Sequence, residues 1–264
     1  MTSLKKLQRN WEGLARMDPL WAICVDPKRR GNQWNREDLL TAGRTEIRRV
    51  MEYLRSLGLV PDAGGAVLDF GCGAGRLTRA LADYFGECWG VDISPAMIAL
   101  AKEFNQDRAA CHFQLNEKDD LSGFTGGKFG FIYSSIVLQH IPRIYAERYL
   151  CEFIRVLRPG GVLVFQIPER EIASIITKLK HRIGLRGVFS RLPGMKTVAP
   201  FHMQMFCFPE SEIRELFKTQ PVYLRDVKLT NSCTGGFNGN LQFLDLEPQA
   251  GFISKQYCVI KTGL

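Results

Sequence analysis

Apolar residues recur with helical spacing in the first sixty residues of the chain. Between residues 35 and 57 the apolar positions are separated by three, four or seven residues, which predicts one amphipathic helix. A shorter helix is predicted over residues 4–17. Pro19 and Pro27 interrupt the helical pattern between these two segments. Residues 1–60 are therefore expected to form a helical cap that precedes the main domain.

Short apolar or β-branched runs alternate with helical patterns from residue 66 onward. This alternation predicts an α/β domain over residues 61–264, in which a parallel sheet has helices on both faces. The predicted strands are residues 66–70, 87–91, 111–115, 129–134, 162–167, 222–229 and 256–261. The predicted helices of this domain are residues 77–84, 95–104, 143–157 and 209–217.

Composition and charge narrow the range of partners. The chain has 264 residues, of which 45% are apolar, so it can bury a full core. The 35 basic residues exceed the 27 acidic residues by 8, which favours an anionic partner without naming one. Residues 170–196 hold seven basic residues and one acidic residue. Because ordinary connections are shorter, residues 170–205 are interpreted as an insertion that contacts a substrate or partner, with a solvated basic helix face as the alternative.

The cysteine pattern and the absence of long apolar runs bear on location. Eight cysteines are scattered along the chain without a Cys-x-x-Cys pair or a spacing suited to zinc, so we predict reduced thiols and no metal site. The first ten residues are polar and basic, and no run reaches the roughly 18 apolar residues of a membrane span. The sequence therefore predicts a cytoplasmic protein without a membrane span.

A glycine-rich turn carries the strongest chemical signal. Residues 67–77 read Val-Leu-Asp-Phe-Gly-Cys-Gly-Ala-Gly-Arg-Leu, with Gly71, Gly73 and Gly75 at every second position. Such glycines permit positive φ angles and are expected to let a ligand approach bare backbone amides near a helix N-terminus. Asp92 follows at the end of the next predicted strand, where a carboxylate can accept the hydroxyl hydrogens of a ribose. Together these features predict a nucleoside-containing ligand.

The glycine spacing and a nearby acid discriminate between nucleoside cofactors. Dinucleotide sites follow Gly-x-Gly-x-x-Gly, and an acid just upstream would repel their pyrophosphate. Here the spacing is Gly-x-Gly-x-Gly, and Asp69 stands two residues before it. An acid at this place suits the cationic amino end of S-adenosylmethionine (SAM). The motif resembles the signature of the class I SAM-dependent methyltransferases, which is hydrophobic-hydrophobic-Asp-x-Gly-x-Gly-x-Gly followed by an acid after the second strand.

The resemblance extends over roughly residues 65–170. Residues 129–142 look like the fourth strand of that family and its sequel, although Gly130 stands where the family usually has Asp. Residues 157–161, Leu-Arg-Pro-Gly-Gly, look like the turn that enters its fifth strand. The resemblance implies a Rossmann-like sheet of seven strands, mostly parallel with the last strand antiparallel, and SAM as the cofactor.

The resemblance also implies cofactor contacts, residue by residue. Asp69 would orient the amino group of SAM, Asp92 would bind the ribose, and Ile93 would pack on the adenine. Asn116 or Glu117 occupies the region that often contacts the adenine amino group, although residues 115–121 depart from the usual Gly-Asp-Ala pattern. The full set of expected cofactor-binding residues is Asp69, Gly71, Cys72, Gly73, Gly75, Arg76, Asp92, Ile93, Met97, Asn116, Glu117, Ser134 and Gln139.

Two histidines are candidates for catalysis. Methyl transfer from a sulfonium is an in-line displacement that needs alignment, and a base only if the acceptor is still protonated. In the class I SAM-dependent methyltransferases, which this sequence resembles, the segment after the fourth strand faces the methyl group. The resemblance therefore makes Gln139 and His140 candidates for contact with the acceptor. With an ordinary pKa near 6.5, His140 could serve as the base, and the alternative is that it only caps the following helix. His202, in an apolar and aromatic segment, is the second candidate.

The acceptor is expected to be a small molecule methylated on oxygen or nitrogen. The family's (Asp/Asn)-Pro-Pro-(Tyr/Phe) motif for planar amino groups is replaced by Tyr-Ser-Ser-Ile at residues 133–136. The cap and the insertion are expected to form the acceptor pocket, and the basic insertion suggests an acceptor of acidic character. Two alternatives are a tRNA or rRNA methyltransferase that uses the basic patch and a SAM-binding interaction protein without turnover.

Overall fold

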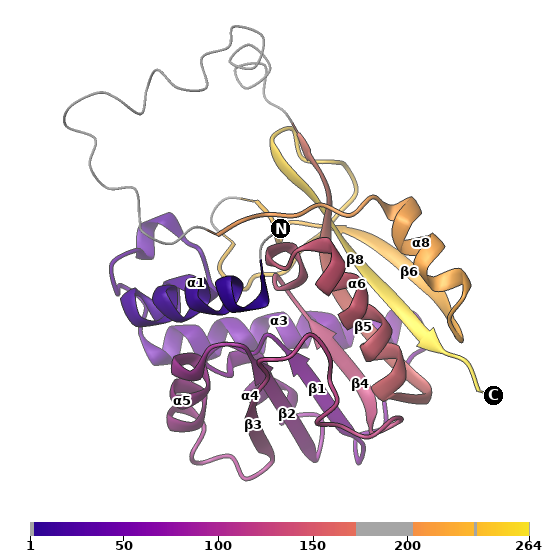
Figure 1. Ribbon diagram of the computed structural model, residues 1–264, viewed down its shortest axis with the longest axis horizontal. Helices are drawn as coiled ribbons and strands as arrows, with labels where there is room; N and C mark the ends of the chain where they lie inside the picture. Colours follow the sequence, from indigo (N-terminus) through magenta and orange to yellow (C-terminus); the bar gives the residue numbers. More distant parts are fainter. Residues whose placement is uncertain (1–2, 173–202, 235–236, 264) are drawn as a thin grey trace, which may run out of the picture.

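The computed structural model describes residues 3–172, 203–234 and 237–263. Its centre is one mixed sheet in the order β3-β2-β1-β4-β5-β8-β6-β7 (Figure 1). The first five strands pair in parallel, whereas β8 runs antiparallel between β5 and β6. The strands are β1 (Ala66–Phe70), β2 (Glu87–Asp92), β3 (Cys111–Leu115), β4 (Phe129–Ser134), β5 (Leu157–Ile172), β6 (Val222–Thr230), β7 (Phe243–Leu244) and β8 (Gly251–Lys261).

This topology confirms the predicted Rossmann-like α/β fold with an antiparallel last strand. The predicted count of seven strands is wrong by one, because β7 has only two residues and is too short to produce a hydrophobic pattern. β5 is also longer than its predicted core at residues 162–167, since its far end pairs with β8 from Arg170 to Ile172. Three residues of the expected insertion therefore belong to the sheet. Residues 173–202 of that segment, His202 included, lie outside the described residues, whereas residues 203–205 are described.

Side chains at the helix N-termini fix where several helices begin. Asn35 accepts a hydrogen bond from the amide of Asp38, and Ser94 accepts one from Met97. The predicted helix at residues 77–84 ends early at Leu81, and a five-residue helix after Pro19 was not predicted because one turn carries no periodicity. The helices are α1 (Leu4–Met17), α2 (Pro19–Ile23), α3 (Arg36–Ser56), α4 (Arg76–Leu81), α5 (Pro95–Phe104), α6 (Arg143–Val156) and α8 (Glu210–Lys218), with 3₁₀ turns at Pro27–Arg29 and Leu138–His140.

Both faces of the sheet are buried, as a parallel sheet requires. Leu163 and Phe165 of β5 face a layer that contains α6 and α8, whereas Val162 and Val164 face the opposite layer with α3 and α4. This alternation follows the two-residue period of a strand. None of the helices in the described ranges combines the length and the apolar character that crossing a membrane requires.

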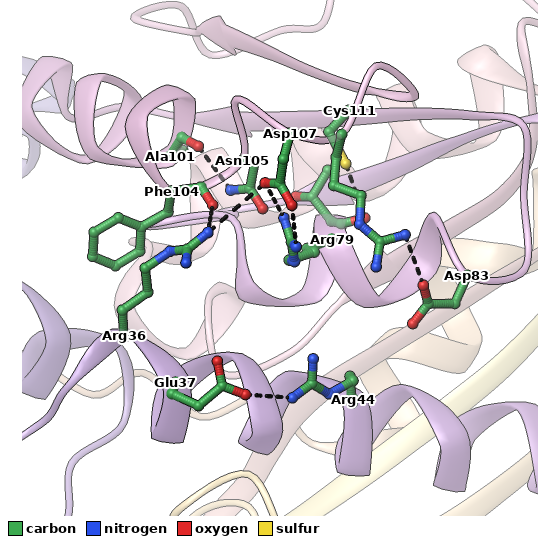
Figure 2. A network of polar contacts seen from close by, with 12 residues as sticks. Arg36, Glu37, Arg44, Arg79, Asp83, Ala101, Phe104, Asn105, Asp107 and Cys111 are labelled. Atoms are coloured by element: carbon green, nitrogen blue, oxygen red, sulfur yellow. Dashed lines mark hydrogen bonds and ion pairs between the residues drawn. The ribbon is translucent and has the colours of Figure 1, made fainter.

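A polar network attaches the cap helix α3 to the main domain. Figure 2 shows Asp107, in the turn between α5 and β3, receiving two hydrogen bonds from Arg79 of α4 at 2.7 and 2.6 Å. Arg36 of α3 donates to the backbone carbonyl of Phe104 at 2.5 Å and lies 3.8 Å from the carboxylate of Asp107. These contacts hold the pKa of Asp107 well below its usual range, with the bonds from Arg79 as the largest cause. The cap is thus linked to the turn that leads into β3.

Candidate active site

A cavity of about 340 Å³ lies where the carboxyl ends of β1, β2 and β4 meet the cap. Its wall combines the glycine-rich turn, the ends of β2 and β3, the segment after β4, the cap and the chain around Cys233. The residues that line it are Leu4, Leu7, Trp11, Ala22, Ile23, Val25, Phe70, Gly71, Cys72, Gly73, Arg76, Leu77, Val91, Asp92, Ile93, Met97, Asn116, Ser135, Ile136, Val137, Gln139, His140, Ile141, Tyr149, Met203, Met205, Ser232, Cys233, Thr234, Phe237 and Phe252.

Two glycines of the turn are required by close packing as well as by backbone conformation. Gly71 has a φ of +77°, and a Cβ placed on it would lie 2.3 Å from Cγ2 of Val137. Gly73 has a φ of +52°, and its Cβ would lie 2.9 Å from Cγ1 of Ile23 in the cap. The turn is therefore pressed between the segment after β4 and α2, and a side chain at either position would occupy the space of its neighbour.

The amides of this turn are not bare, contrary to the expectation from sequence. Gly71 and Cys72 both donate to the carbonyl of Val91, at 2.8 and 2.9 Å. Gly73 donates to Oδ2 of Asp92 at 2.9 Å, and Gly75 donates to the carbonyl of Cys72 at 2.9 Å. The glycine spacing folds the turn back onto β2 and uses up these donors. With the amides of Gly71, Cys72, Gly73 and Gly75 engaged, the turn suits the pyrophosphate of a dinucleotide less well than it suits a cationic ligand.

Asp92 stands at the cavity wall at the end of β2. Its carboxylate accepts hydrogen bonds from the amides of Gly73 and Ser94, both at 2.9 Å. Burial raises the pKa of Asp92, while these N–H bonds oppose that rise. Each oxygen still has lone-pair capacity, because a carboxylate accepts about four hydrogen bonds. The structure thus provides a fixed acceptor beside the turn.

The expected adenine contacts separate into two groups. Three of them line the cavity near Asp92. Ile93 and Met97 follow Asp92 in the chain, and Asn116 follows Leu115, which pairs with Asp92 across the sheet. The amide of Asn116 donates to the carbonyl of Asp92 at 2.9 Å, and its side chain donates to the carbonyl of Asp120 at 3.0 Å. Glu117 lies on the surface instead, where it accepts a hydrogen bond from Gln8, so Asn116 is the member of the pair that reaches the cavity.

Asp69 and Ser134 lie behind the cavity wall and are not among the described residues that line it. Oδ2 of Asp69 accepts a hydrogen bond from Thr78 at 2.6 Å, whereas its Oδ1 has no partner among the described residues. Burial raises the pKa of Asp69 to about 7. Ser134 donates to the carbonyl of Phe70 at 3.3 Å and so joins β4 to β1. Gly75 is likewise absent from the described lining and forms the N-cap of α4.

Arg76 reaches the cavity, but its charge is neutralised inside the protein. Its guanidinium lies 2.7 Å from Glu46 of α3, and the two side chains are 2% and 0% exposed. Tyr133 donates its hydroxyl to the other oxygen of Glu46 at 2.9 Å. Arg76 and Tyr133 are thus part of a buried group centred on a residue of the cap. The pair of Arg76 and Glu46 carries no net charge, so it has little attraction to offer an anionic ligand.

His140 is buried in a neutral state, which corrects the expectation of an ordinary pKa. Its Nδ1 lies 2.7 Å from the carbonyl oxygen of Gln204, which can only accept, so Nδ1 carries the proton. Nε2 then accepts from the side-chain amide of Gln139 at 3.1 Å. Burial lowers the pKa of His140 to about 4, against the opposing effect of Gln204. The ring also makes an edge contact with Trp11 of α1, at 5.1 Å between centroids.

Several lining residues were missed because nothing in their local sequence marks them. Trp11 and Ile23 come from the cap, Cys233 and Phe252 come from either side of β7, and Val137 follows β4. The cap and the insertion were expected as whole segments to form the acceptor pocket, and no individual residues of the cap were chosen. Tertiary packing brings these side chains together, and the spacing of apolar residues along one sequence does not indicate which distant side chains will meet.

The residues present fit SAM better than a dinucleotide. SAM has a ribose and two cationic groups, so its site needs hydrogen-bond acceptors more than anion-binding amides. The cavity wall supplies the Asp92 carboxylate, and the buried carboxylate of Asp69 keeps one oxygen without a described partner directly behind the turn.

Comparison with known sequences supports this interpretation. A family model described as a methyltransferase domain matches residues 68–165. Tocopherol O-methyltransferase of Arabidopsis thaliana is 32% identical over 127 residues, which are 45% of this chain and 36% of that protein. Demethylmenaquinone methyltransferase of Tropheryma whipplei (strain Twist) is 34% identical over 133 residues, which are 49% and 52% of the two chains. The chain thus spans about half or less of the length of these two relatives.

A solved structure supports the fold. Magnesium protoporphyrin IX methyltransferase from Synechocystis PCC 6803, with bound S-adenosylhomocysteine (SAH), superposes with a TM-score of 0.55 at 20% identity and covers 86% of each chain. At this identity the likeness concerns the fold alone. The matched methyltransferase domain, the sheet order and the glycine-rich turn agree with one another, and together they support a class I SAM-dependent methyltransferase.

Proposed function

We propose that this protein transfers the methyl group of SAM to an oxygen or nitrogen atom of a small-molecule acceptor. The observation that carries the proposal is that Asp92 and the glycine-rich turn line the same cavity as Gln139 and His140. Methyl transfer requires cofactor and acceptor to be aligned in one enclosed space. The two relatives named for tocopherol and demethylmenaquinone support an acceptor of small-molecule size.

The cofactor end of the cavity is assigned to the residues around Asp92. Its carboxylate would accept the ribose hydroxyls, and Ile93 and Met97 would pack against the adenine. The turn from Gly71 to Gly73 would hold the methionine end. When bound, SAM supplies an electrophilic methyl group on its sulfonium. The protein contributes orientation and the exclusion of water.

The acceptor end of the cavity favours an uncharged molecule. Met203, Met205, Phe237 and Phe252 give it an apolar wall. Arg76 is the one lysine or arginine among the described lining residues, and Glu46 neutralises it. Bringing a carboxylate into such a wall without a partner is costly. The acidic acceptor suggested by the basic insertion therefore draws no support from the described part of the cavity, and we propose a neutral alcohol, phenol or amine.

His140 is assigned to holding the acceptor rather than to strong base catalysis. With its pKa near 4, the imidazole stays neutral at physiological pH, and its conjugate acid is too strong to be formed readily from a phenol or alcohol. Its Nε2 lone pair accepts from the Gln139 amide in this structure, and an acceptor hydroxyl or amine would donate to the same lone pair by taking the place of that amide. Such a bond would orient the attacking atom, while the proton leaves to solvent after methyl transfer.

Calorimetry and an acceptor pair of matched shape test the proposal. SAM and SAH are expected to bind with measurable affinity and to raise the melting temperature, whereas NAD, the control, is expected to do neither. SAH release is then followed with 2-naphthol and with 2-naphthoic acid, which share a ring system and differ in charge. Faster release with naphthol is the expected result. No binding of SAM or SAH would refute the proposed activity, and a preference for the acid would refute the neutral acceptor.

A further inference from the structure

The segment after β4 contains a residue in an unfavourable backbone conformation. Ile136 has a φ of +54°, in the left-handed region that β-branched residues rarely adopt. It lines the cavity, as do Ser135 before it and Val137 after it. Such strain persists only when surrounding contacts enforce it, and it tends to occur at functional sites. The contacts that hold Ile136 therefore matter for the shape of the cavity.

The side chain of Gln166 holds this residue in place. Gln166 lies on β5 and is 1% exposed. Its Oε1 accepts a hydrogen bond from the amide of Ile136 at 2.8 Å. Its Nε2 donates to Oε1 of Gln139 at 3.2 Å and to the hydroxyl of Ser254. Because the Ile136 amide can only donate, the orientation of the Gln166 side chain is determined by its partners.

The residues that follow Ile136 make contacts that link Gln166 to both ends of the cavity. Val137, the next residue, packs closely on Gly71 of the glycine-rich turn at residues 71–75, which we call the cofactor turn because of its proposed function. A Cβ placed on Gly71 would lie 2.3 Å from Cγ2 of Val137. Three residues after Ile136, Gln139 bonds both Gln166 and the ring of His140. The buried side-chain amide of Gln166 thus contacts the segment after β4, which lies between the glycine-rich turn and the residues proposed to bind the acceptor.

We propose that Gln166 is a positioning residue for methyl transfer. Its side-chain carbonyl holds Ile136 in the left-handed conformation, which sets Val137 against the cofactor turn and Gln139 beside His140. The inference rests on the proposed function and adds a residue that has no direct place in the cavity lining. Without the Gln166 carbonyl, Ile136 relaxes towards negative φ, Val137 moves, and the cofactor turn loses its support.

The chain offers a matched control on the neighbouring strand. Gln256 of β8 stands opposite Gln166 in the β5–β8 register and is 0% exposed. Neither atom of its side-chain amide has a partner among the described residues. Replacing Gln256 by leucine removes a buried amide of the same kind without removing a contact to Ile136. A general effect of altering a buried glutamine would therefore appear in both variants.

The test measures SAH affinity by calorimetry in a double-mutant cycle. Gln166→Leu is expected to weaken SAH binding at least tenfold, and Gln256→Leu less than twofold. Glycine adopts positive φ freely, so in an Ile136→Gly background Gln166→Leu is expected to cost less than threefold. A merely structural role of Gln166 would give the same loss in both backgrounds. Equal losses, or equal effects of Gln166→Leu and Gln256→Leu, would overturn the proposal.

Two further measurements keep the outcomes distinct. If Gln166→Leu does not fold by circular dichroism, Gln166→Met, which keeps the shape of the side chain, takes its place in the same cycle with the same criteria. The wild-type protein is titrated first. Wild-type protein that does not bind SAH refutes the proposed function, whereas wild-type binding together with a Gln166→Leu variant of unchanged affinity refutes the positioning role alone.

Discussion

Replacing Gly71 by alanine should disturb the glycine-rich turn in two ways. At a φ of +77° a Cβ costs about 1–2 kcal/mol relative to glycine. That Cβ would also lie 2.3, 2.5 and 2.9 Å from Cγ2, Cγ1 and Cβ of Val137, all far inside van der Waals contact. Relieving such overpacking typically costs about 1–3 kcal/mol. We therefore expect Gly71→Ala to lower the free energy of unfolding by about 2–5 kcal/mol.

Urea unfolding and SAH calorimetry measure the two consequences. Because domains of this kind are stable by only about 5–15 kcal/mol, a loss of this size is easily detected. Val137→Ala removes the two γ-carbons that clash while leaving its Cβ in place. The double variant should recover most of the steric part, and its remaining loss relative to Val137→Ala should approach the backbone cost of about 1–2 kcal/mol.

The comparison of single and double variants decides whether the reasoning holds. If Gly71→Ala costs as much in the Val137→Ala background as in the wild type, the close approach of Val137 is not the cause. If Gly71→Ala costs less than about 1 kcal/mol and leaves SAH affinity unchanged, the conformational argument also fails.

Three other predictions concern side chains in or beneath the cavity. Asp92→Ala should weaken SAM binding by roughly 1.5–3 kcal/mol, the scale of hydrogen bonds to a charged group, and an unchanged dissociation constant in calorimetry would exclude its ribose role. Because burial lowers the pKa of His140 to about 4 from 6.5, the unfolded chain takes up that proton first, and stability falls as pH drops from about 6.5 to about 4. His140→Phe should reduce this loss by about 3 kcal/mol between the two limits, as measured by urea unfolding at several pH values; parallel pH profiles for both proteins would contradict the buried neutral state. Glu46→Gln should lower the free energy of unfolding by about 3–5 kcal/mol because it leaves Arg76 buried without a counter-charge. The double variant Glu46→Leu, Arg76→Met should have a markedly higher free energy of unfolding than Glu46→Gln, because it has no buried charge. Equal free energies of unfolding for Glu46→Gln and the double variant would contradict this explanation.

The sequence was sufficient for features that depend on local pattern. Helix α5 was predicted with its observed bounds, because Ser94 and Pro95 mark its start and apolar spacing marks its length. The glycine-rich turn and Asp92 meet at the cavity wall because residues at the carboxyl ends of adjacent parallel strands lie close together, and their part in binding a cofactor stays a prediction. The two-residue strand β7 and the long end of β5 were missed, since neighbouring strands define them rather than their own residues.

Tertiary contacts decided what the pattern left open at the site. The neutral state of His140 follows from its burial, in which it contacts Trp11, while the carbonyl of Gln204 decides which ring nitrogen carries the proton. Both of these partners are remote from His140 in sequence. The glycine spacing predicted where the turn lies but not that Val91 and Asp92 would use its amides. Gln166 is the one polar residue in the predicted strand at residues 162–167, and its role is indicated only by its contact with Ile136.

The buried pair of Glu46 and Arg76 bears on how this protein can be divided. One member comes from the cap and the other from the first helix after the cofactor turn, so the pair crosses the boundary drawn near residue 60. A fragment without the cap would leave the arginine uncompensated, and we expect it to be unfolded rather than merely inactive. Exchanging caps between related enzymes to alter acceptor choice would therefore succeed only where the donor sequence brings its own carboxylate to this place. We therefore expect the cap and the domain to unfold together, and changes of acceptor to be reached more readily by substitution within the whole chain than by exchange of its parts.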